Sequence, residues 1–269
     1  MRVPFIKMHG LGNDFVVLDA RESALPTPSE ATARALADRR TGIGCDQLVY
    51  LSGSERTDAR MRIFNQDGSE VGACGNATRA VALLIGGDCR IETADRILEA
   101  SPTSNGAAVD MGEPVSDWAA IPLAYAMDTA AMPVGWDMLA DASAVNVGNP
   151  HIVFFVDDCD AVALETLGPQ IETDPLFPER INVNVATVES DTRIRLRVWE
   201  RGAGLTRACG TGACATAVAA IRRKLVLSPV TVALPGGELK IAWVPGETIR
   251  MTGPATESFR GSFEWNDFA

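Results

Sequence analysis

Two cysteines stand in almost the same short sequence, one in each half of the chain. Cys74 lies in GACGNATRA (72–80) and Cys209 in RACGTGACA (207–215). The small residues after each predict the first turn of a helix, where free N–H groups and the helix dipole stabilise a thiolate and lower its pKa. A free cysteine is more commonly just a small buried residue. The repetition favours proton transfer by both thiols over that simpler role.

The surroundings of the two cysteines repeat as well. RMRIFN (60–65) aligns with RLRVWE (195–200) at the same offset as the cysteines, and Gln47 aligns with Asn182. GNDFVVLD (12–19) aligns with GNPHIVFFVD (148–157), and MGEP (111–114) resembles MTGP (251–254). Several matches in one order indicate an internal duplication.

Each copy predicts a Gly-Asn turn, an apolar strand, a helix (near 29–40 in the first copy), further strands and the cysteine turn. RMRIFN alternates polar and apolar residues as a strand does, and the alanine-rich stretches after the cysteines predict buried helices. We expect an α/β (α+β) fold with two pseudo-symmetric duplicated domains. The first spans 1–114, joined by the tail 255–269, and the second spans 115–254, with 115–143 as the crossover.

The duplication suggests a specific chemistry. If a pseudo-two-fold axis relates the domains, both thiols can face one active-site cleft between them from opposite sides. A thiolate would then remove an α-proton while a thiol protonates the opposite face, which inverts the carbon. Gly75 and Gly210 would let backbone N–H groups approach the reacting carboxylate, although both also suit helix capping.

The charge and composition of the chain argue against several classes of partner and ligand. A net charge of -11 and a pI near 4.7 argue against nucleic acid or an anionic membrane as a partner. No apolar run has the length of a membrane helix and the first residues do not look like a signal peptide, so we expect a cytoplasmic protein. Six cysteines without a CxxC pair, and only two histidines, predict no metal site.

Seven separated stretches carry a family resemblance. They are KMHGLGNDFVVLD, GCDQL, FNQDGSEVGACGNATR, VGNPH, FPERIN, WERGAGLTRACGTGA and MTGPA. Over essentially the whole chain, they closely resemble the diaminopimelate epimerase family. The resemblance implies interconversion of LL- and meso-2,6-diaminopimelate without pyridoxal phosphate or another cofactor, for lysine and peptidoglycan synthesis.

The same resemblance assigns roles to residues. Cys209 would take the α-proton of the LL isomer and Cys74 would protonate the other face, with His151 and Glu200 also influencing catalysis. Glu200 and Arg201 would hold the distal amino-acid end, although adjacent opposite charges are often a solvated surface pair. The remaining substrate-binding residues it implies are Asn13, Gln47, Asn65, Gly75, Asn76, Asn149, Asn182, Gly210 and Thr211. Asparagine beside glycine also commonly forms turns.

Other readings remain open. A proline or hydroxyproline racemase has a similar fold and two cysteines, but does not need Glu200 and Arg201. A phenazine-biosynthesis-like isomerase shares the fold without the cysteine pair, and a non-catalytic binding protein would need no thiols. Phe259 replaces a tyrosine found at a dimer contact in some relatives, which leaves formation of a homodimer open.

Overall fold

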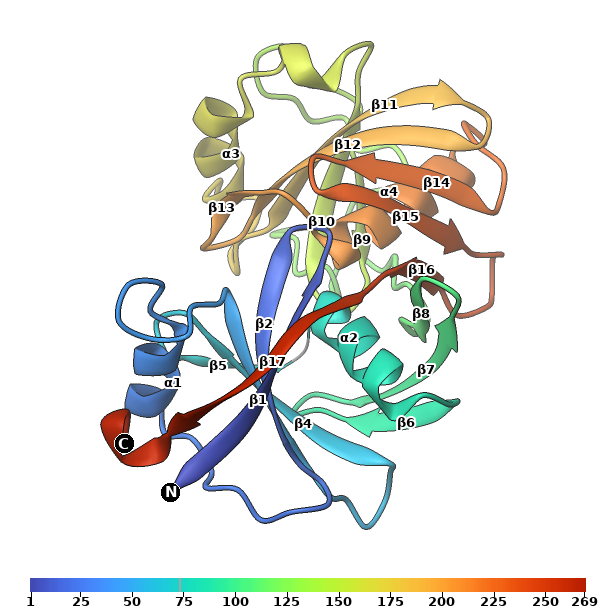
Figure 1. Ribbon diagram of the computed structural model, residues 1–269. Helices are drawn as coiled ribbons and strands as arrows, with labels where there is room; N and C mark the ends of the chain where they lie inside the picture. The colour runs from blue at the N-terminus through green and yellow to red at the C-terminus, as the bar shows by residue number, and fades with distance from the viewer. Residues whose placement is uncertain (73) are drawn as a thin grey trace. The chain divides into compact units, whose positions relative to one another are not determined.

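The chain folds into two compact units. The computed structural model describes residues 1–72 and 74–269, and it divides them into unit 1, residues 1–109 with 253–269, and unit 2, residues 110–252. The sequence places the corresponding boundaries after 114 and 254. Figure 1 shows the elements of each unit.

Unit 1 contains nine strands and two α-helices among the described residues. The strands are β1 Arg2–Gly10, β2 Asn13–Ala20, β3 Gln47–Ser52, β4 Ala59–Asn65, β5 Glu70–Val71, β6 Cys89–Glu92, β7 Ile97–Thr103, β8 Gly106–Asp110 and β17 Thr256–Glu264. The helices are α1 Glu30–Ala37 and α2 Gly75–Ile85. Pairing runs β17-β1-β2-β3-β4-β6-β7-β8, with β5 also beside β4. The expected helix near 29–40 and the strand at 60–65 are confirmed.

Unit 2 is built from residues between β8 and the end of β16. Its strands are β9 Ser143–Asn146, β10 Pro150–Phe155, β11 Asn182–Ser190, β12 Arg193–Glu200, β13 Gly204–Thr206, β14 Val230–Leu234, β15 Gly237–Ala242 and β16 Arg250–Pro254, the last of which crosses into unit 1. Its helices are α3 Leu164–Glu172 and α4 Gly210–Arg222, with the short η1 Cys159–Ala161. Pairing runs β9-β10-β11-β12-β14-β15-β16, with β13 also beside β12.

The two pairing orders confirm the duplication. β2 and β3 are parallel, as are β10 and β11, and β3 and β4 are antiparallel, as are β11 and β12. The register agrees residue by residue, because Phe15 pairs with Gln47 in unit 1 where His151 pairs with Asn182 in unit 2. A one-residue slip would turn every side chain to the other face. Residues that align between the two copies therefore also lie on the same face of their sheets.

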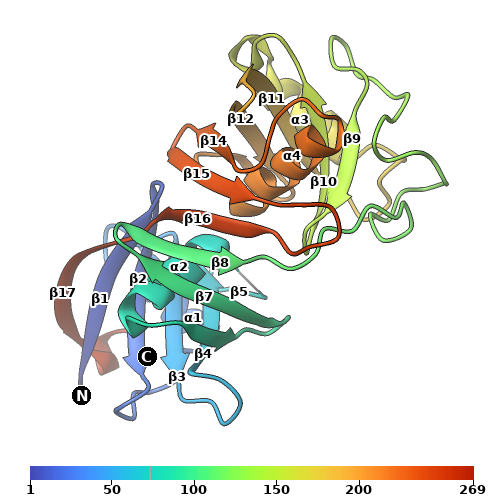
Figure 2. The same ribbon diagram turned by 90° about the vertical axis from the view of Figure 1, so that its right-hand side faces the viewer.

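One central helix in each unit begins at a cysteine. Cys74 is the N-cap of α2 and Cys209 is the N-cap of α4. Helix α2 packs against β1, β6 and β7, and α4 packs against strands from β9 to β15, as Figure 2 shows. Their small apolar residues allow this close packing, because residues such as Ala80 and Ala217 are almost completely buried. The prediction of two buried helices is confirmed.

Both ends of the chain lie together in unit 1. The Met1 carbonyl accepts a hydrogen bond from the Trp265 N–H at 2.9 Å, and the Met1 ammonium lies 3.2 Å from a Glu264 carboxylate oxygen. Phe263 and Trp265 pack on the core beneath α1. Strand β17 thus extends the sheet beside β1, and the C-terminus lies next to α1 (Figure 1). No helix in the described part of the chain is both long and apolar enough to cross a membrane.

Candidate functional site

The Cys74 turn places a thiol beside two asparagines. Cys74 has extended backbone angles (φ −147°, ψ 115°), and its carbonyl accepts from the Thr78 N–H at 2.9 Å, which starts α2. Its sulfur donates to Oδ1 of Asn13 at 3.9 Å. The same Oδ1 accepts from Nδ2 of Asn76 at 3.3 Å. The structure therefore brings three of the expected site residues of unit 1 together.

Charged residues behind this turn hold Asn13 in place. Oδ2 of Asp46 accepts from Nδ2 of Asn13 and from the Asp14 N–H, both at 3.1 Å. Arg39 bridges the two carboxylates, and Lys7 donates to Asp14. Burial opposes ionisation of Asp14, but hydrogen bonds from Arg39 and Lys7 outweigh it and lower its pKa to about 2. Because Asp46 engages the amide nitrogen of Asn13, the oxygen faces Cys74.

Gln47 and Asn65 form a second polar pair in unit 1. They face each other across β3 and β4, and Nε2 of Gln47 donates to Oδ1 of Asn65 at 3.1 Å. Asn65 donates in turn to Oγ of Ser69 at 3.2 Å. Oε1 of Gln47 is buried and has no hydrogen-bond partner among the described residues. A buried acceptor of this kind suits an N–H donor supplied by a ligand.

The Cys209 turn surrounds its sulfur differently. Sγ accepts from the Gly212 N–H at 3.3 Å and lies 3.4 Å from Oγ1 of Thr211. Cys209 is only 4% exposed. Burial and the negative charge of Glu200 raise its pKa well above the usual thiol value, although the Thr211 and Gly212 hydrogen bonds act in the other direction. The expectation of a lowered pKa is therefore wrong at Cys209, because desolvation outweighs the helix N-terminus.

Glu200 and Arg201 engage separate partners at the end of β12. Oε1 of Glu200 accepts from Oγ1 of Thr206 at 2.5 Å, and Nη1 of Arg201 donates to the Glu179 carbonyl at 2.9 Å. In residues 1–72 and 74–269, no salt bridge joins Glu200 to Arg201. The Arg201 side chain is exposed, whereas its N–H donates to Oδ1 of Asn182 at 2.9 Å. The two charged side chains therefore contact different neighbours.

Asn182 stabilises the backbone of unit 2, in addition to the substrate-binding role that the family resemblance implies. It is 3% exposed, and its Nδ2 donates to the Pro150 carbonyl at 2.7 Å. Because its Oδ1 holds the Arg201 N–H, this amide connects the start of β10 to the turn after β12. Asn182 therefore fixes the backbone that carries Arg201.

His151 lies in the interior of unit 2 between two amides. It is fully buried, and burial lowers its pKa to about 3, which leaves the ring neutral. Its Nε2 lies 3.1 Å from Oδ1 of Asn149, and its Nδ1 lies 3.1 Å from Nδ2 of Asn184. The structure thus joins His151 to one expected binding residue and to Asn184, which the sequence did not single out.

The two glycines that follow the cysteines open their helices. Gly75 is the first residue of α2 and Gly210 the first of α4. A Cβ on Gly210 would lie 3.1 Å from the sulfur of Met251. The missing side chain therefore permits close packing as well as access to the first N–H groups of the helix.

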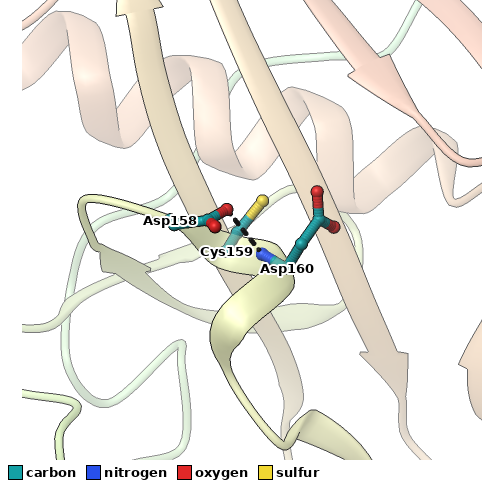
Figure 3. Close-up of side chains that lie close together, drawn as sticks. All are labelled: Asp158, Cys159 and Asp160. Atoms are coloured by element: carbon teal, nitrogen blue, oxygen red, sulfur yellow. Dashed lines mark hydrogen bonds between the residues drawn. The ribbon is translucent and has the colours of Figure 1, made fainter.

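A group of possible metal ligands lies elsewhere in unit 2 and is shown in Figure 3. Asp158, Cys159 and Asp160 have side-chain oxygens or sulfur within 4.8 Å of one another. Arg195 forms ion pairs with both carboxylates, and the Cys159 thiol donates to the Arg195 carbonyl at 3.7 Å. Asp158 also caps η1 by accepting from the Asp160 N–H. These contacts already account for the cluster as an arginine-centred ion network.

Comparison with known proteins supplies the decisive observation. The model of the family described as "Diaminopimelate epimerase" matches residues 5–116 and 143–257, which include both cysteine turns. The chain belongs to the diaminopimelate epimerase family. A diaminopimelate epimerase of Erythrobacter litoralis is 64% identical over 269 residues, covering 100% of both chains. Another of Rhizorhabdus wittichii is 65% identical over 268 residues, covering 100% of this chain and 98% of the relative.

A solved structure shows that the fold extends beyond close relatives. The PhzF-family phenazine biosynthesis protein of Bacillus anthracis superposes with a TM-score of 0.70 at 15% identity, covering 98% of this chain and 99% of that one. At this identity the likeness concerns the fold. It agrees with a mixed α/β architecture of two duplicated domains.

Two polar side chains beside the expected site residues were not singled out from the sequence, the partly exposed Asp46 and the buried Asn184. Asp46 stands inside the GCDQL motif, so its position next to Gln47 was a signal that it could contribute. Asn184 aligns with Val49 in the repeat, and only that polar-for-apolar difference marks it. In both cases the role depends on a side-chain hydrogen bond that spacing along the chain does not reveal.

Proposed function

We propose that this protein is a diaminopimelate epimerase that interconverts the LL and meso isomers of 2,6-diaminopimelate without a cofactor. One observation carries the proposal: cysteines occupy the N-cap positions of two equivalent helices, in a chain of this family. Inversion of a carbon needs a proton acceptor on one face and a donor on the other. Two duplicated turns supply two such groups.

Each cysteine acts on one face of the α-carbon. Cys209 removes the α-proton from the LL isomer, and Cys74 delivers a proton to the opposite face to give the meso isomer. In the reverse reaction the two residues exchange roles. The N–H groups that open α2 and α4 stabilise the charge that develops on the α-carboxylate.

Glu200 acts with Cys209. The raised pKa of Cys209 keeps the thiol protonated at neutral pH, which suits proton delivery in the direction from meso to LL. For the opposite direction this thiol must first lose its proton to solvent, and the hydrogen bonds from Thr211 and Gly212 stabilise the thiolate that remains. His151 is buried and neutral, so it acts by orienting Asn149.

Charge and hydrogen bonding also explain substrate recognition. Arg201 offers a planar two-point contact to the distal carboxylate, and Glu200 offers a negative charge to the distal ammonium. The unpartnered Oε1 of Gln47 adds a buried acceptor for an ammonium. The other binding residues we assign are Asn13, Asn65, Gly75, Asn76, Asn149, Asn182, Gly210 and Thr211. We also propose that the enzyme is cytoplasmic and that it can form homodimers.

A polarimetric assay tests the function. The purified protein, with no cofactor added, is incubated with LL-diaminopimelate and, separately, with L-proline. We expect optical rotation to decay for diaminopimelate, because the meso product is optically inactive, and to stay constant for proline. Decay with proline alone would assign the protein to proline racemisation. Constant rotation with both, together with tight binding of diaminopimelate, would make it a binding protein.

A further inference from the structure

The two units differ at one pair of equivalent positions inside their sheets. In unit 1 the register places Phe15 and Val49 on neighbouring parallel strands, and both are fully buried. At the matching positions of unit 2 stand His151 and Asn184, also fully buried. The fold accepts apolar side chains here, and burying polar ones costs free energy. A polar pair in only one copy therefore points to a functional purpose.

The hydrogen bonds of this pair determine which ring nitrogen of His151 accepts and which donates. The amide Nδ2 of Asn184 donates, so Nδ1 of His151, 3.1 Å away, accepts. A neutral imidazole has one N–H, which is then on Nε2 and donates to Oδ1 of Asn149 at 3.1 Å. Because its oxygen is engaged by the ring, Asn149 turns its NH₂ group away from His151. A donor in that position suits a carboxylate.

Helix α4 packs closely against the strand that carries Asn184. A Cβ built on Gly212 would lie 3.1 Å from Oδ1 of Asn184 and 3.3 Å from Cβ of Cys209. The Gly212 N–H is the same group that donates to the Cys209 sulfur. Oδ1 of Asn184 has no hydrogen-bond partner among the described residues, and Nδ2 is the amide atom that contacts His151.

We propose that Asn184 is a positioning residue that fixes His151 as the Nε2–H tautomer and thereby presents the NH₂ group of Asn149 to a substrate carboxylate. The kinetic part of this proposal rests on the proposed function. The tautomer does not depend on it. Asn184 acts through His151 and Asn149 and makes no contact with substrate itself.

Nitrogen-15 NMR of the imidazoles tests the tautomer directly. The chain has two histidines, so a His9→Gln variant assigns the signals of His151. In the wild-type protein we expect Nε2 protonated and Nδ1 unprotonated across about pH 5 to 8, where an ordinary histidine titrates. Asn184→Asp replaces the donor by an acceptor of the same size and should move a proton onto Nδ1. A protonated Nδ1 in wild type, or no change in Asn184→Asp, would overturn the proposal.

Kinetics with diaminopimelate test the consequence for binding. Asn184→Leu keeps the side-chain size and removes the donor, so we expect KM to rise about fivefold, equivalent to about 1 kcal/mol, with kcat within about twofold. Thr216→Val is the matched control, because Thr216 is fully buried in α4 and its hydroxyl has no partner among the described residues. It should leave KM and the His151 signals unchanged. An unchanged KM in Asn184→Leu would contradict the proposal.

The two readouts separate the possible failures. If wild type shows the Nε2–H tautomer but does not turn over diaminopimelate, the proposed function fails and the positioning of His151 stands. If Asn184→Leu does not fold, Asn184→Asp and the wild-type spectrum still decide the tautomer. If Thr216→Val raises KM as much as Asn184→Leu, general loosening of unit 2 explains the effect and the proposal is wrong.

Discussion

The sulfur atoms of Cys74 and Cys209 meet opposite kinds of hydrogen-bonding group. Cys74 donates to the side-chain oxygen Oδ1 of Asn13, whereas Cys209 accepts from the Gly212 N–H. An acceptor favours the thiol and a donor favours the thiolate. At Cys209, however, burial and Glu200 outweigh the donors. Equivalent turns therefore give their thiols different electrostatic surroundings, which suits residues that exchange acid and base roles.

Glu200→Gln tests the charge at Cys209. Removing the negative charge beside a thiol lowers the pKa of that thiol, so thiolate forms at lower pH. In a Cys74→Ala background, alkylation of Cys209 by iodoacetamide should begin at lower pH in Glu200→Gln than in the parent, followed by mass spectrometry of the labelled peptide. In the protein with both cysteines, Glu200→Gln should also lower epimerase activity. An onset of labelling that does not move would show that Glu200 does not act on Cys209.

Arg201→Lys tests recognition of the distal carboxylate. Lysine keeps the charge but loses the planar two-point contact that a guanidinium makes. We expect KM to increase at least tenfold, with a smaller fall in kcat if binding of the distal end helps to align the α-carbon. Arg180→Lys, an exposed arginine of the same unit, is the control. Wild-type kinetics in Arg201→Lys would leave Arg201 as a surface residue.

At the scale of elements, charged residues fix where strands and turns meet. Asp14 on β2 is held by Lys7 from β1 and by Arg39 from the segment after α1. Asp46 joins the same network immediately before β3 and directs Asn13 toward Cys74. The network is partly buried, and its polar atoms find partners within it. It therefore supports the geometry of the Cys74 turn from several elements.

The lowered pKa of Asp14 predicts how stability depends on pH. A carboxyl whose folded-state pKa lies near 2, below its ordinary value of 3.8, contributes stability above pH 3.8 that is lost as pH falls toward 2. Asp14→Asn should therefore lower the free energy of unfolding by roughly 2 kcal/mol at pH 7 and flatten its dependence between about pH 4 and 2. Glu55→Gln, on an exposed loop, should do neither. Urea titrations in which Asp14→Asn behaves like Glu55→Gln would exclude this contribution.

Much of this architecture was accessible from sequence periodicity. The alternation in RMRIFN predicted β4, and the alanine-rich runs predicted α2 and α4. The pKa of Cys209 was not accessible, because burial depends on the tertiary packing around the helix start. The pairing of His151 with Asn184 was also hidden, because it joins diagonal positions on two strands that are distant in the chain. Sequence patterns thus predicted the strands and helices, whereas the pKa of Cys209 and the hydrogen bond of His151 depend on tertiary contacts.

At the scale of the whole molecule, the two units differ in the number of chain segments that form them. Unit 2 is one continuous segment, whereas unit 1 combines residues from both ends. Strand β17 pairs along the length of β1, and Phe263 packs against Phe5 with ring centroids 6.4 Å apart. We therefore expect the folding of unit 1 to depend on residues 255–269.

A chain that ends at Pro254 tests that dependence. Losing residues 255–269 removes β17, the hydrogen-bonded neighbour of β1, and also removes Phe263 and Trp265, which exposes core residues such as Phe5 beneath α1. We expect a lower melting temperature and limited proteolysis that cuts first within residues 1–109. A shorter deletion, of Ala269 alone, is the control. Equal protease resistance of the truncated and full-length chains would show that unit 1 does not need β17.

Exchange of α-protons with D₂O in single cysteine variants tests whether two thiols serve opposite faces of one carbon. Epimerisation should fall by orders of magnitude in both Cys74→Ala and Cys209→Ala, each factor of ten being about 1.4 kcal/mol of barrier. Cys74→Ala should still incorporate deuterium from LL-diaminopimelate without inversion, because Cys209 remains, whereas Cys209→Ala should favour exchange at the D-centre of the meso isomer. Equal exchange from both isomers in either variant would contradict the assignment of faces. Near-normal epimerisation in both variants would contradict the two-thiol mechanism.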